Sequence, residues 1–208
     1  MYDNDPFGSF GSFHMSKLLA LDVAILPPPD VRDRAVTLSA SLPRDEDHDL
    51  RLDAEHLPHI TLTQQFVRVE ERDVAFERVD AALRGQPALT VRVTGGAKGS
   101  NSVWMAIERS EELADLHERL MEALRGFERP RGTPGAFFEE DARVGDVLWV
   151  TGYRLTSSFG AFTPHITLGY ADEPPRVEPF TFRATTVAAC HLGRFCACRR
   201  ALRTWELV

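Results

Sequence analysis

The feature of the sequence that most constrains its fold is a five-residue word, Pro-His-Ile-Thr-Leu, that occurs twice, with its histidines at His59 and His165. In an extended strand, side chains two positions apart point to the same face. His59 and Thr61 therefore project together, as do His165 and Thr167, while the Ile and Leu of each copy face the buried side. Two unrelated strands have no packing reason to share all these residues. The repeat predicts two equivalent strands around one site.

Strand and helix patterns alternate around the repeat. We expect strands at 18–26, 59–67, 88–93, 102–108, 165–170, 180–191 and 195–207. A first helix is expected from Asp30, as its N-cap, to near Pro43, and a second from about Glu71 to Arg84. A third begins at Ser110 and places leucines at helical spacing on one face.

The remaining segments decide how the chain is divided. Loops or turns are expected at 44–55, 95–99, 129–145 and 192–194, the last as the turn of a hairpin. Residues 147–153 fit a strand by composition and a helix by the spacing of Trp149 and Tyr153. Strands mixed with helices and hairpins favour an α+β fold with antiparallel sheets. We expect one domain at 15–208, after a disordered or non-native leader at 1–14.

Charge and cysteine content indicate which class of ligand the protein binds and in which compartment it works. Asp and Glu number 31 against 24 Lys and Arg, which gives a formal net charge of −7. Such a protein repels a long polyanion, so we expect no long double-stranded nucleic acid as partner, and a small phosphorylated ligand instead. No apolar run reaches membrane-spanning length, so no membrane association is expected. The odd, clustered set of three cysteines is atypical of a disulfide framework and indicates a reducing cytoplasm.

The same cysteines are candidate zinc ligands, because Cys196 and Cys198 lie near Cys190 and His191 in the sequence. A structural zinc site usually has two separated pairs of ligands. Alternation along one strand explains Cys196 and Cys198 as small buried residues. The sequence therefore predicts no metal site and no cofactor.

The repeated His and Thr pair is suited to phosphate chemistry. A Thr hydroxyl can donate to a non-bridging phosphate oxygen. A neutral His can take a proton from water, and a protonated His can give one to a leaving oxygen. Displacement at phosphorus needs both acts on opposite sides. Two such strands across a cleft would supply them without a metal and would give a bell-shaped pH–rate profile.

With both motifs in view, the chain resembles the 2H phosphoesterase superfamily, whose members carry two His-x-Thr/Ser-x motifs. It is most similar to the 2′–5′ RNA ligase-like branch, which includes RNA 2′,3′-cyclic phosphodiesterases. The resemblance runs from about Leu18 to the end and includes HITLTQQFV, SVWMAIERSEELADLHERLMEAL, FTPHITLGY and FCACRRALRTWEL. It implies a bilobal fold with pseudo-twofold symmetry, in which two antiparallel sheets backed by helices carry one motif each beside a central cleft.

The resemblance also implies a reaction. Members of the branch act on 2′,3′-cyclic phosphate ends of RNA or nucleotides, typically opening them to the 2′-phosphate, or on 2′–5′ linkages. The motif residues that carry over are His59, Thr61, His165 and Thr167. By analogy, His165 is the base that activates water and His59 the acid at the departing oxygen. Running the reaction in reverse exchanges these roles.

Several further residues are candidates for substrate contacts. They are Thr63, Trp149, Tyr153, Arg154, Phe162 and Tyr170. Aromatic faces near the second motif can stack on a base, or else serve in the core. Arg154 offers charge to a phosphate, or else lies in solvent, and Thr63 continues the cleft-facing row of the first motif. Gln64 and Gln65 mark either a bulge or a polar rim, and the sequence leaves both open.

The leading prediction is a monomeric, cytoplasmic phosphodiesterase that needs no metal. Two alternatives stay open. The same residues can join RNA ends through a 2′–5′ bond, or the cleft can serve as a non-catalytic module that binds nucleotides or RNA ends. The base preference of the substrate is not predicted.

Overall fold

A computed structural model describes residues 16–43, 48–100 and 102–208, so the predicted leader at 1–14 lies outside the described residues. The strands are β1 (Leu18–Leu26), β2 (Ile60–Arg68), β3 (Leu89–Lys98), β4 (Ser102–Ile107), β5 (His165–Tyr170), β6 (Phe180–Ala184), β7 (Thr186–Leu192) and β8 (Cys198–Glu206). The α-helices are α1 (Pro29–Ser41), α2 (Arg72–Leu83), α3 (Glu111–Leu124) and α4 (Val144–Thr156).

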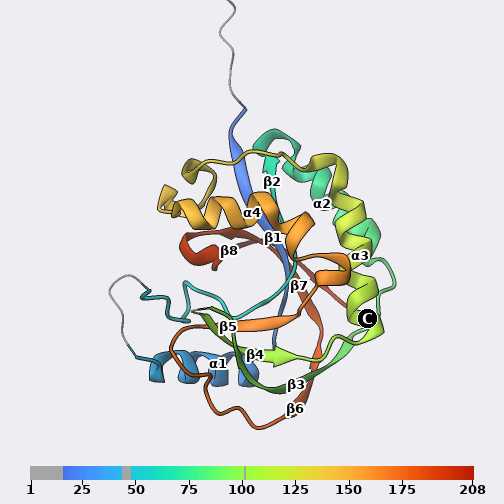
Figure 1. The fold of residues 1–208 in the computed structure, drawn as a ribbon. Coiled ribbons are helices and arrows are strands. Elements are labelled where there is room, and N and C mark those ends of the chain that lie inside the picture. Colours follow the sequence, from blue (N-terminus) through green and yellow to red (C-terminus); the bar gives the residue numbers. More distant parts are fainter. Residues whose placement is uncertain (1–15, 44–47, 101) are drawn as a thin grey trace, which may run out of the picture.

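The strands form two four-stranded sheets built to one plan. The first sheet has the order β2-β1-β7-β8 and the second the order β5-β4-β3-β6, and all pairings are antiparallel. The strand of each motif lies at an edge, beside β1 in one sheet and β4 in the other. Figure 1 shows α4 in the upper half of the molecule, α1 in the lower half, and α2 and α3 along one side. The predicted α+β fold with two duplicated halves is confirmed.

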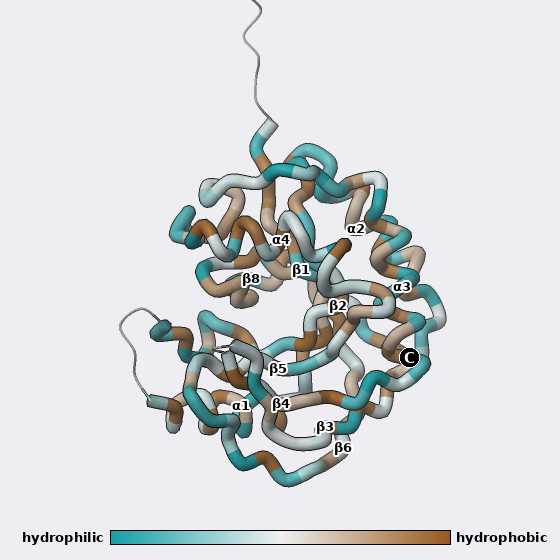
Figure 2. The backbone as a smooth tube through the Cα atoms, viewed as in Figure 1, coloured by the Kyte–Doolittle hydropathy of each residue, from teal (hydrophilic) through white to brown (hydrophobic). Residues whose placement is uncertain are grey.

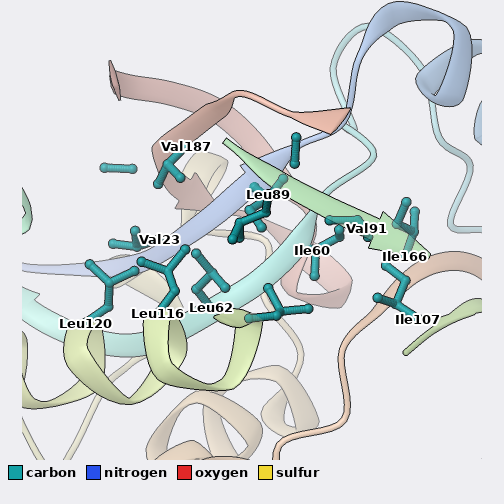
Figure 3. Packing of buried hydrophobic residues seen from close by; sticks show 14 of the residues in the cluster. Val23, Ile60, Leu62, Leu89, Val91, Ile107, Leu116, Leu120, Ile166 and Val187 are labelled. Carbon is teal, nitrogen blue, oxygen red and sulfur yellow. The ribbon is translucent and has the colours of Figure 1, made fainter. Parts of the chain in front are cut away.

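A continuous hydrophobic core joins the two sheets. It takes residues from both sheets and from α1, α2 and α3, while a smaller cluster lies between α4 and the first sheet. Ile60 and Ile166, one from each repeat, are fully buried in the large core together with Leu62. Figure 3 shows them with Leu116 and Leu120 of α3. Figure 2 shows apolar residues on strands and helices, with hydrophilic residues along the outer loops.

The third helix forms for the reasons that the sequence supplies. The Ser110 hydroxyl accepts a hydrogen bond from the Leu113 backbone N–H at 3.2 Å, which caps the start of α3. Leu113, Leu116, Leu120 and Leu124 are all buried on one face. Asp30 is not a cap, because Pro28 occupies that position and Asp30 lies in the first turn of α1.

Two predictions about the strands were wrong. The glycine-rich run before Gly99 is not a turn, because β3 continues to Lys98. Gly96 has another role there, since a Cβ at this position would clash with the carbonyl oxygen of Pro175. Residues 180–191 are not one strand either. The chain breaks at Thr185, and β6 pairs with β3 whereas β7 pairs with β1, so the break carries the chain from one sheet to the other.

Other segments agree with the sequence or settle its ambiguities. The ambiguous residues at 147–153 belong to helix α4. The final hairpin of β7 and β8 forms as expected, but its connection is longer, because a 3-10 turn occupies Arg194–Cys196 and β8 begins only at Cys198. Cys196 is therefore half-buried in the turn and does not share a strand with Cys198. The loop before α4 contains short 3-10 turns. Among the described helices, none combines the length and apolar character that crossing a bilayer requires.

Candidate active site

The four residues of the two His-x-Thr pairs line one cleft between the sheets. This cleft has a volume of about 740 Å³, and His59, Thr61, His165 and Thr167 all contribute to its wall. The first pair lies at the start of β2 and the second on β5, so each sheet provides one pair from its edge strand. The duplicated word therefore brings two imidazoles to one volume, as strand alternation predicts.

Both imidazoles are held in the same way. Nδ1 of His59 lies 2.8 Å from the carbonyl oxygen of Leu57, and Nδ1 of His165 lies 2.7 Å from that of Thr163. A carbonyl only accepts, so Nδ1 carries a hydrogen in each ring and Nε2 is left for the cleft. Leu57 is itself fixed, because its N–H donates to the carbonyl of Cys198 on β8 at 2.9 Å. The two rings thus present the same nitrogen to the same space.

A bulge follows Thr61 in the first motif. The pairing of β2 with β1 skips Leu62, so that Thr61 and Thr63 face consecutive residues of β1. The extra residue reverses the alternation, and Gln64 returns to the cleft while Thr63 is fully buried away from it. Thr63 was therefore wrongly placed by simple alternation. Of the two readings left open for Gln64, the bulge is the correct one.

The second motif has the equivalent bulge. The pairing of β5 with β4 skips Leu168, and Thr167 and Gly169 face consecutive residues of β4. Gly169 has a φ of 145°, and a Cβ there would lie 3.1 Å from the carbonyl oxygen of Leu50. Only glycine accommodates this backbone without strain. Tyr170 then returns to the cleft, at the position that corresponds to Gln64.

A buried carboxylate lies under the first motif. Asp22 is fully buried on β1, and its Oδ2 accepts hydrogen bonds from Thr61 at 2.7 Å and from Gln64 at 2.8 Å. The same oxygen is 3.7 Å from Nε2 of His59. Oδ1 has no hydrogen-bond partner among the described residues. Burial raises the pKa of Asp22, against the opposing effects of His59, Gln64 and Thr61.

Asp22 is a residue that the sequence interpretation missed. Its signal was a lone charged residue in the middle of the apolar strand LLALDVAIL. Its contact with Thr61 also changes one expectation. The Thr61 hydroxyl donates to Asp22 in this structure, so its hydrogen is directed to the floor of the cleft and away from a phosphate.

The second motif has no carboxylate at the corresponding place. Ser102 faces Tyr170 across the strands as Asp22 faces Gln64. The ring of Trp104 lies beside His165, with centroids 5.0 Å apart. Burial lowers the pKa of His165, the bond to the Thr163 carbonyl opposes this, and the positive charge of His59 adds to the lowering. The neutral form of His165 is favoured.

The sequence model of the 2′–5′ RNA ligase superfamily matches residues 27–191, a range that contains both motifs. The chain belongs to this superfamily. The structure of Escherichia coli LigT without ligand is similar, with a TM-score of 0.57, 20% identity and coverage of 93% of this chain and 99% of that one. LigT has also been solved with 3′-AMP, with a TM-score of 0.59, 20% identity and coverage of 92% and 99%.

A third similar structure is TT0787 of Thermus thermophilus, with a TM-score of 0.58, 19% identity and coverage of 91% of this chain and 98% of that one. No curated protein matches the chain. At these identities the solved structures establish a shared fold. The assignment to the 2H phosphoesterases, made from the motifs, is confirmed.

Most of the aromatic candidates lie in the cleft of this superfamily member. Trp149, Tyr153, Phe162 and Tyr170 all line it. The indole N–H of Trp149 donates to the Gln64 side-chain oxygen at 2.9 Å, and 48% of Trp149 is exposed. Phe162 is buried and stacks on His117 with ring centroids 4.0 Å apart. Burial raises the pKa of Tyr153, and the nearby charge of Asp22 adds to the effect.

Arg154 was wrongly predicted to face the ligand. Its guanidinium binds Glu128 at 2.6 Å and Glu122 at 3.2 Å, and it is not among the residues that line the cleft. Helix geometry explains the error, because Arg154 follows Tyr153 by about 100° of rotation. The side chain that reaches towards α3 therefore cannot also reach the cleft.

The cation of the cleft is Arg143, which the sequence interpretation also missed. Arg143 is the one Lys or Arg among the described residues of the lining. It pairs with Asp146 at 2.7 Å, lies 3.4 Å from the Tyr170 hydroxyl, and stacks over Phe195 with its guanidinium carbon 3.9 Å from the ring centre. A residue in a predicted loop carried no pattern that could single it out.

The described residues contain one group with three metal-ligand types, Asp22, His59 and Cys198, with ligand atoms within 4.8 Å of one another. Burial raises the pKa of Cys198 well above its usual range, so the thiol keeps its proton. A metal would also occupy Nε2 of His59, the nitrogen that the bond to Leu57 leaves for the cleft. The other residues weighed for zinc have separate partners, since His191 binds the Ala136 carbonyl and Cys196 contacts that of Asp146.

Proposed function

We propose that this superfamily member is a metal-independent phosphodiesterase that opens 2′,3′-cyclic phosphates of nucleotides or RNA ends to 2′-phosphates. One observation carries the proposal. Two imidazoles, each with Nδ1 bound to a backbone carbonyl, leave Nε2 for one cleft. Phosphoester chemistry of the ligase or phosphodiesterase type belongs to the superfamily as a whole.

The reaction requires one proton to be taken and one to be given. His165, whose neutral form is favoured by burial, takes a proton from water through Nε2 as the water oxygen attacks phosphorus. The bond from phosphorus to the 3′ oxygen breaks. His59, beside the Asp22 carboxylate, gives its Nε2 proton to that oxygen. Water is consumed, and the product is a 2′-phosphate with a free 3′ hydroxyl.

Charge on the phosphate needs donors in the same cleft. The Thr167 hydroxyl is the donor that we assign to a non-bridging oxygen, and Arg143 supplies the positive charge. Since the cleft lining offers one such cation among the described residues, a ligand with a single diester charge fits better than a long strand.

We assign the nucleobase of the substrate to the side of the cleft that is lined by aromatic residues. Trp149 from α4 and Tyr170 are partly exposed and offer flat faces on which a nucleobase can stack, whereas Tyr153 and Phe162 line the cleft with almost fully buried rings. Similar structures of LigT have been solved with small adenine nucleotides, 3′-AMP and ATP. Those ligands are in keeping with a nucleotide here, although they do not name the base.

The test is a product assay on 2′,3′-cyclic mononucleotides, 2′–5′ dinucleotides and ADP-ribose cyclic phosphate, with products separated as 2′- and 3′-phosphates. We expect 2′-phosphates from the cyclic substrates. His59→Ala and His165→Ala should each lower kcat by about 10²–10⁴-fold, the usual contribution of a general acid or base. Circular dichroism checks that both variants fold, and EDTA should leave the rate unchanged. Loss of activity with EDTA, or no turnover of any substrate, would overturn the proposal.

Two alternatives use the same cleft. Ligation runs the reaction in reverse, and cleaved tRNA halves test it directly. A binding module would hold 2′-phosphorylated nucleotides tightly and give no product on long incubation. We also propose a cytoplasmic protein, because Cys190, Cys196 and Cys198 are free thiols, and a monomer, because both His-x-Thr pairs of the cleft come from the same chain.

A further inference from the structure

The pseudo-symmetry of the two sheets identifies a position at which the halves differ chemically. Strand pairing sets Asp22 opposite Gln64 in the first sheet and Ser102 opposite Tyr170 in the second. Both pairs follow the same bulge, so Asp22 and Ser102 occupy equivalent places on the strands that neighbour the two motifs. One half has a carboxylate where the other has a hydroxyl.

The carboxylate of Asp22 is fixed in direction. Thr61 and Gln64 both donate to Oδ2, and Gln64 is in turn held by the indole N–H of Trp149. The distance of 3.7 Å from Oδ2 to Nε2 of His59 exceeds a hydrogen bond, so Asp22 acts on this ring by its charge. This nitrogen is the one that faces the cleft.

No other group in contact neutralises Asp22. Within 16–43, 48–100 and 102–208, the one ion pair of Asp22 is with His59. Cys190 of β7 lies opposite Asp22 in the strand pairing. The other titratable groups around Asp22 are Tyr153 from α4, Cys196 before β8, and Cys198 on β8. Burial raises the pKa of all three, which keeps them uncharged. An isolated buried carboxylate is costly, and a positive charge on the adjacent imidazole reduces that cost.

We propose that Asp22 is a positioning residue that keeps the proton on Nε2 of His59 and so makes the first motif the acid of the pair. This inference rests on the proposed phosphodiesterase function and deepens it. When His59 gives its proton to the leaving oxygen, Asp22 is left without its counter-charge. That imbalance favours rapid uptake of a proton from solvent, which resets His59 for the next turnover. His165, beside Trp104, has no such partner among the described residues and serves as the base.

The variant Asp22→Asn tests the charge with little change of shape. The Asn side-chain oxygen can keep both hydrogen bonds from Thr61 and Gln64, and its NH₂ takes the place of Oδ1, which has no partner among the described residues. Asp146→Asn is the matched control. It also removes a buried carboxylate from the cleft wall, but one paired with Arg143.

Histidine NMR on the full chain measures the effect without any substrate. His59 should lose its proton at lower pH in Asp22→Asn than in the wild type, and at the same pH as the wild type in Asp146→Asn. His59→Ala assigns the signal. An unchanged His59 titration in Asp22→Asn, or an equal shift in both variants, would overturn the inference, whether or not the protein hydrolyses any diester.

Kinetics provide the second measurement. A 2′,3′-cyclic nucleotide expels an alkoxide and needs an acid, whereas a 2′-deoxynucleoside 4-nitrophenyl phosphodiester expels an anion that is stable by itself. Asp22→Asn should lower kcat about 10²-fold on the first and less than about threefold on the second. The basic limb of its pH–rate profile should move to lower pH. Equal losses on both substrates would show that Asp22 only maintains the fold.

Discussion

The two halves of the candidate active site have the same backbone framework and differ in the residues that surround the two histidines. In each half a His is bound through Nδ1 to the carbonyl two residues earlier, and a bulge follows the motif Thr. In the first half, however, the residues opposite the motif are Asp22 and Ala24, whereas in the second they are Ser102 and Trp104. The repeated framework supplies two equivalent nitrogens.

The neighbouring strand gives those nitrogens different surroundings, a carboxylate in the first half and an aromatic ring in the second. A carboxylate stabilises a charged imidazole, and an apolar ring with burial stabilises a neutral one. In the proposed mechanism, residues of β1 and β4, which are outside the motifs, decide which histidine is the acid and which is the base. The duplication therefore provides two equivalent histidines. In the proposed mechanism, one pair of unlike residues, Asp22 and Ser102, gives them different roles.

The largest expected effect is a difference between the two histidine variants in how their kcat depends on the leaving group of the substrate. His165→Ala removes the base and should lower kcat by about 10²–10⁴-fold on both a cyclic nucleotide and a 4-nitrophenyl diester. His59→Ala removes the acid and should cause that loss on the cyclic nucleotide alone, because nitrophenolate leaves without a proton. Rates on both substrates measure this. If the pattern is reversed, the roles of the halves are exchanged; if both variants lose both activities equally, the comparison between the halves fails.

A smaller effect is expected when the second half is given the charge of the first. Ser102→Asp would place a carboxylate near His165, whose pKa is lowered by burial in the native protein. A neighbouring negative charge raises the pKa of an imidazole, so His165 would stay protonated to higher pH and could not act as base there. We expect the acid limb of the pH–rate profile to move to higher pH, with a loss of at least about tenfold at pH ~6.

The control for this exchange is Ser102→Asn, which adds similar bulk without charge. It should leave the acid limb in place. An equal change in both variants would mean that the effect comes from volume in the cleft, and the electrostatic comparison between Asp22 and Ser102 would be wrong.

The sequence predicted the symmetric part of the site well. Period-two alternation within five residues was enough to place His59 with Thr61 and to bury Ile60. These relations are local, so they depend only on the strand itself. The same holds for α3, where the cap and the leucine spacing fixed the buried face.

The asymmetric part was not predictable in this way. Thr63 was misplaced because the bulge is a property of the pairing between β1 and β2, and it cannot be derived from β2 alone. Asp22 was visible as a charge in an apolar strand, but its partner Thr61 is 39 residues away. Arg154 and Arg143 could be told apart only once the rotation of α4 was known. Each of these errors involves a contact between distant elements.

The smallest expected effect is on stability, and it compares two buried carboxylates. Burial raises the pKa of Asp22 in the folded state above its ordinary value. Between the pKa of the unfolded chain and the higher pKa of the folded protein, the folded state therefore binds more protons than the unfolded state. The free energy of unfolding falls as pH rises through this range. Asp22→Asn removes that loss. It should raise the free energy of unfolding at pH ~8 by about 1–3 kcal/mol, because a neutral amide costs less to bury than a carboxylate, with little gain near pH ~4, where the buried carboxyl is already neutral.

Asp146→Asn should have the opposite sign. Asp146 accepts hydrogen bonds from the Arg143 guanidinium and from the backbone N–H groups of Arg143 and Phe195, so its charge is satisfied. Because Arg143 is partly exposed, we expect a loss of only about 1 kcal/mol. Urea unfolding at pH ~5 and pH ~8 measures both variants. When a buried charge that serves catalysis is removed, the protein becomes more stable and loses activity. If Asp22→Asn instead destabilises the protein at the higher pH as Asp146→Asn does, Asp22 is a structural tie between β1 and β2, and the difference between the two halves has no catalytic meaning.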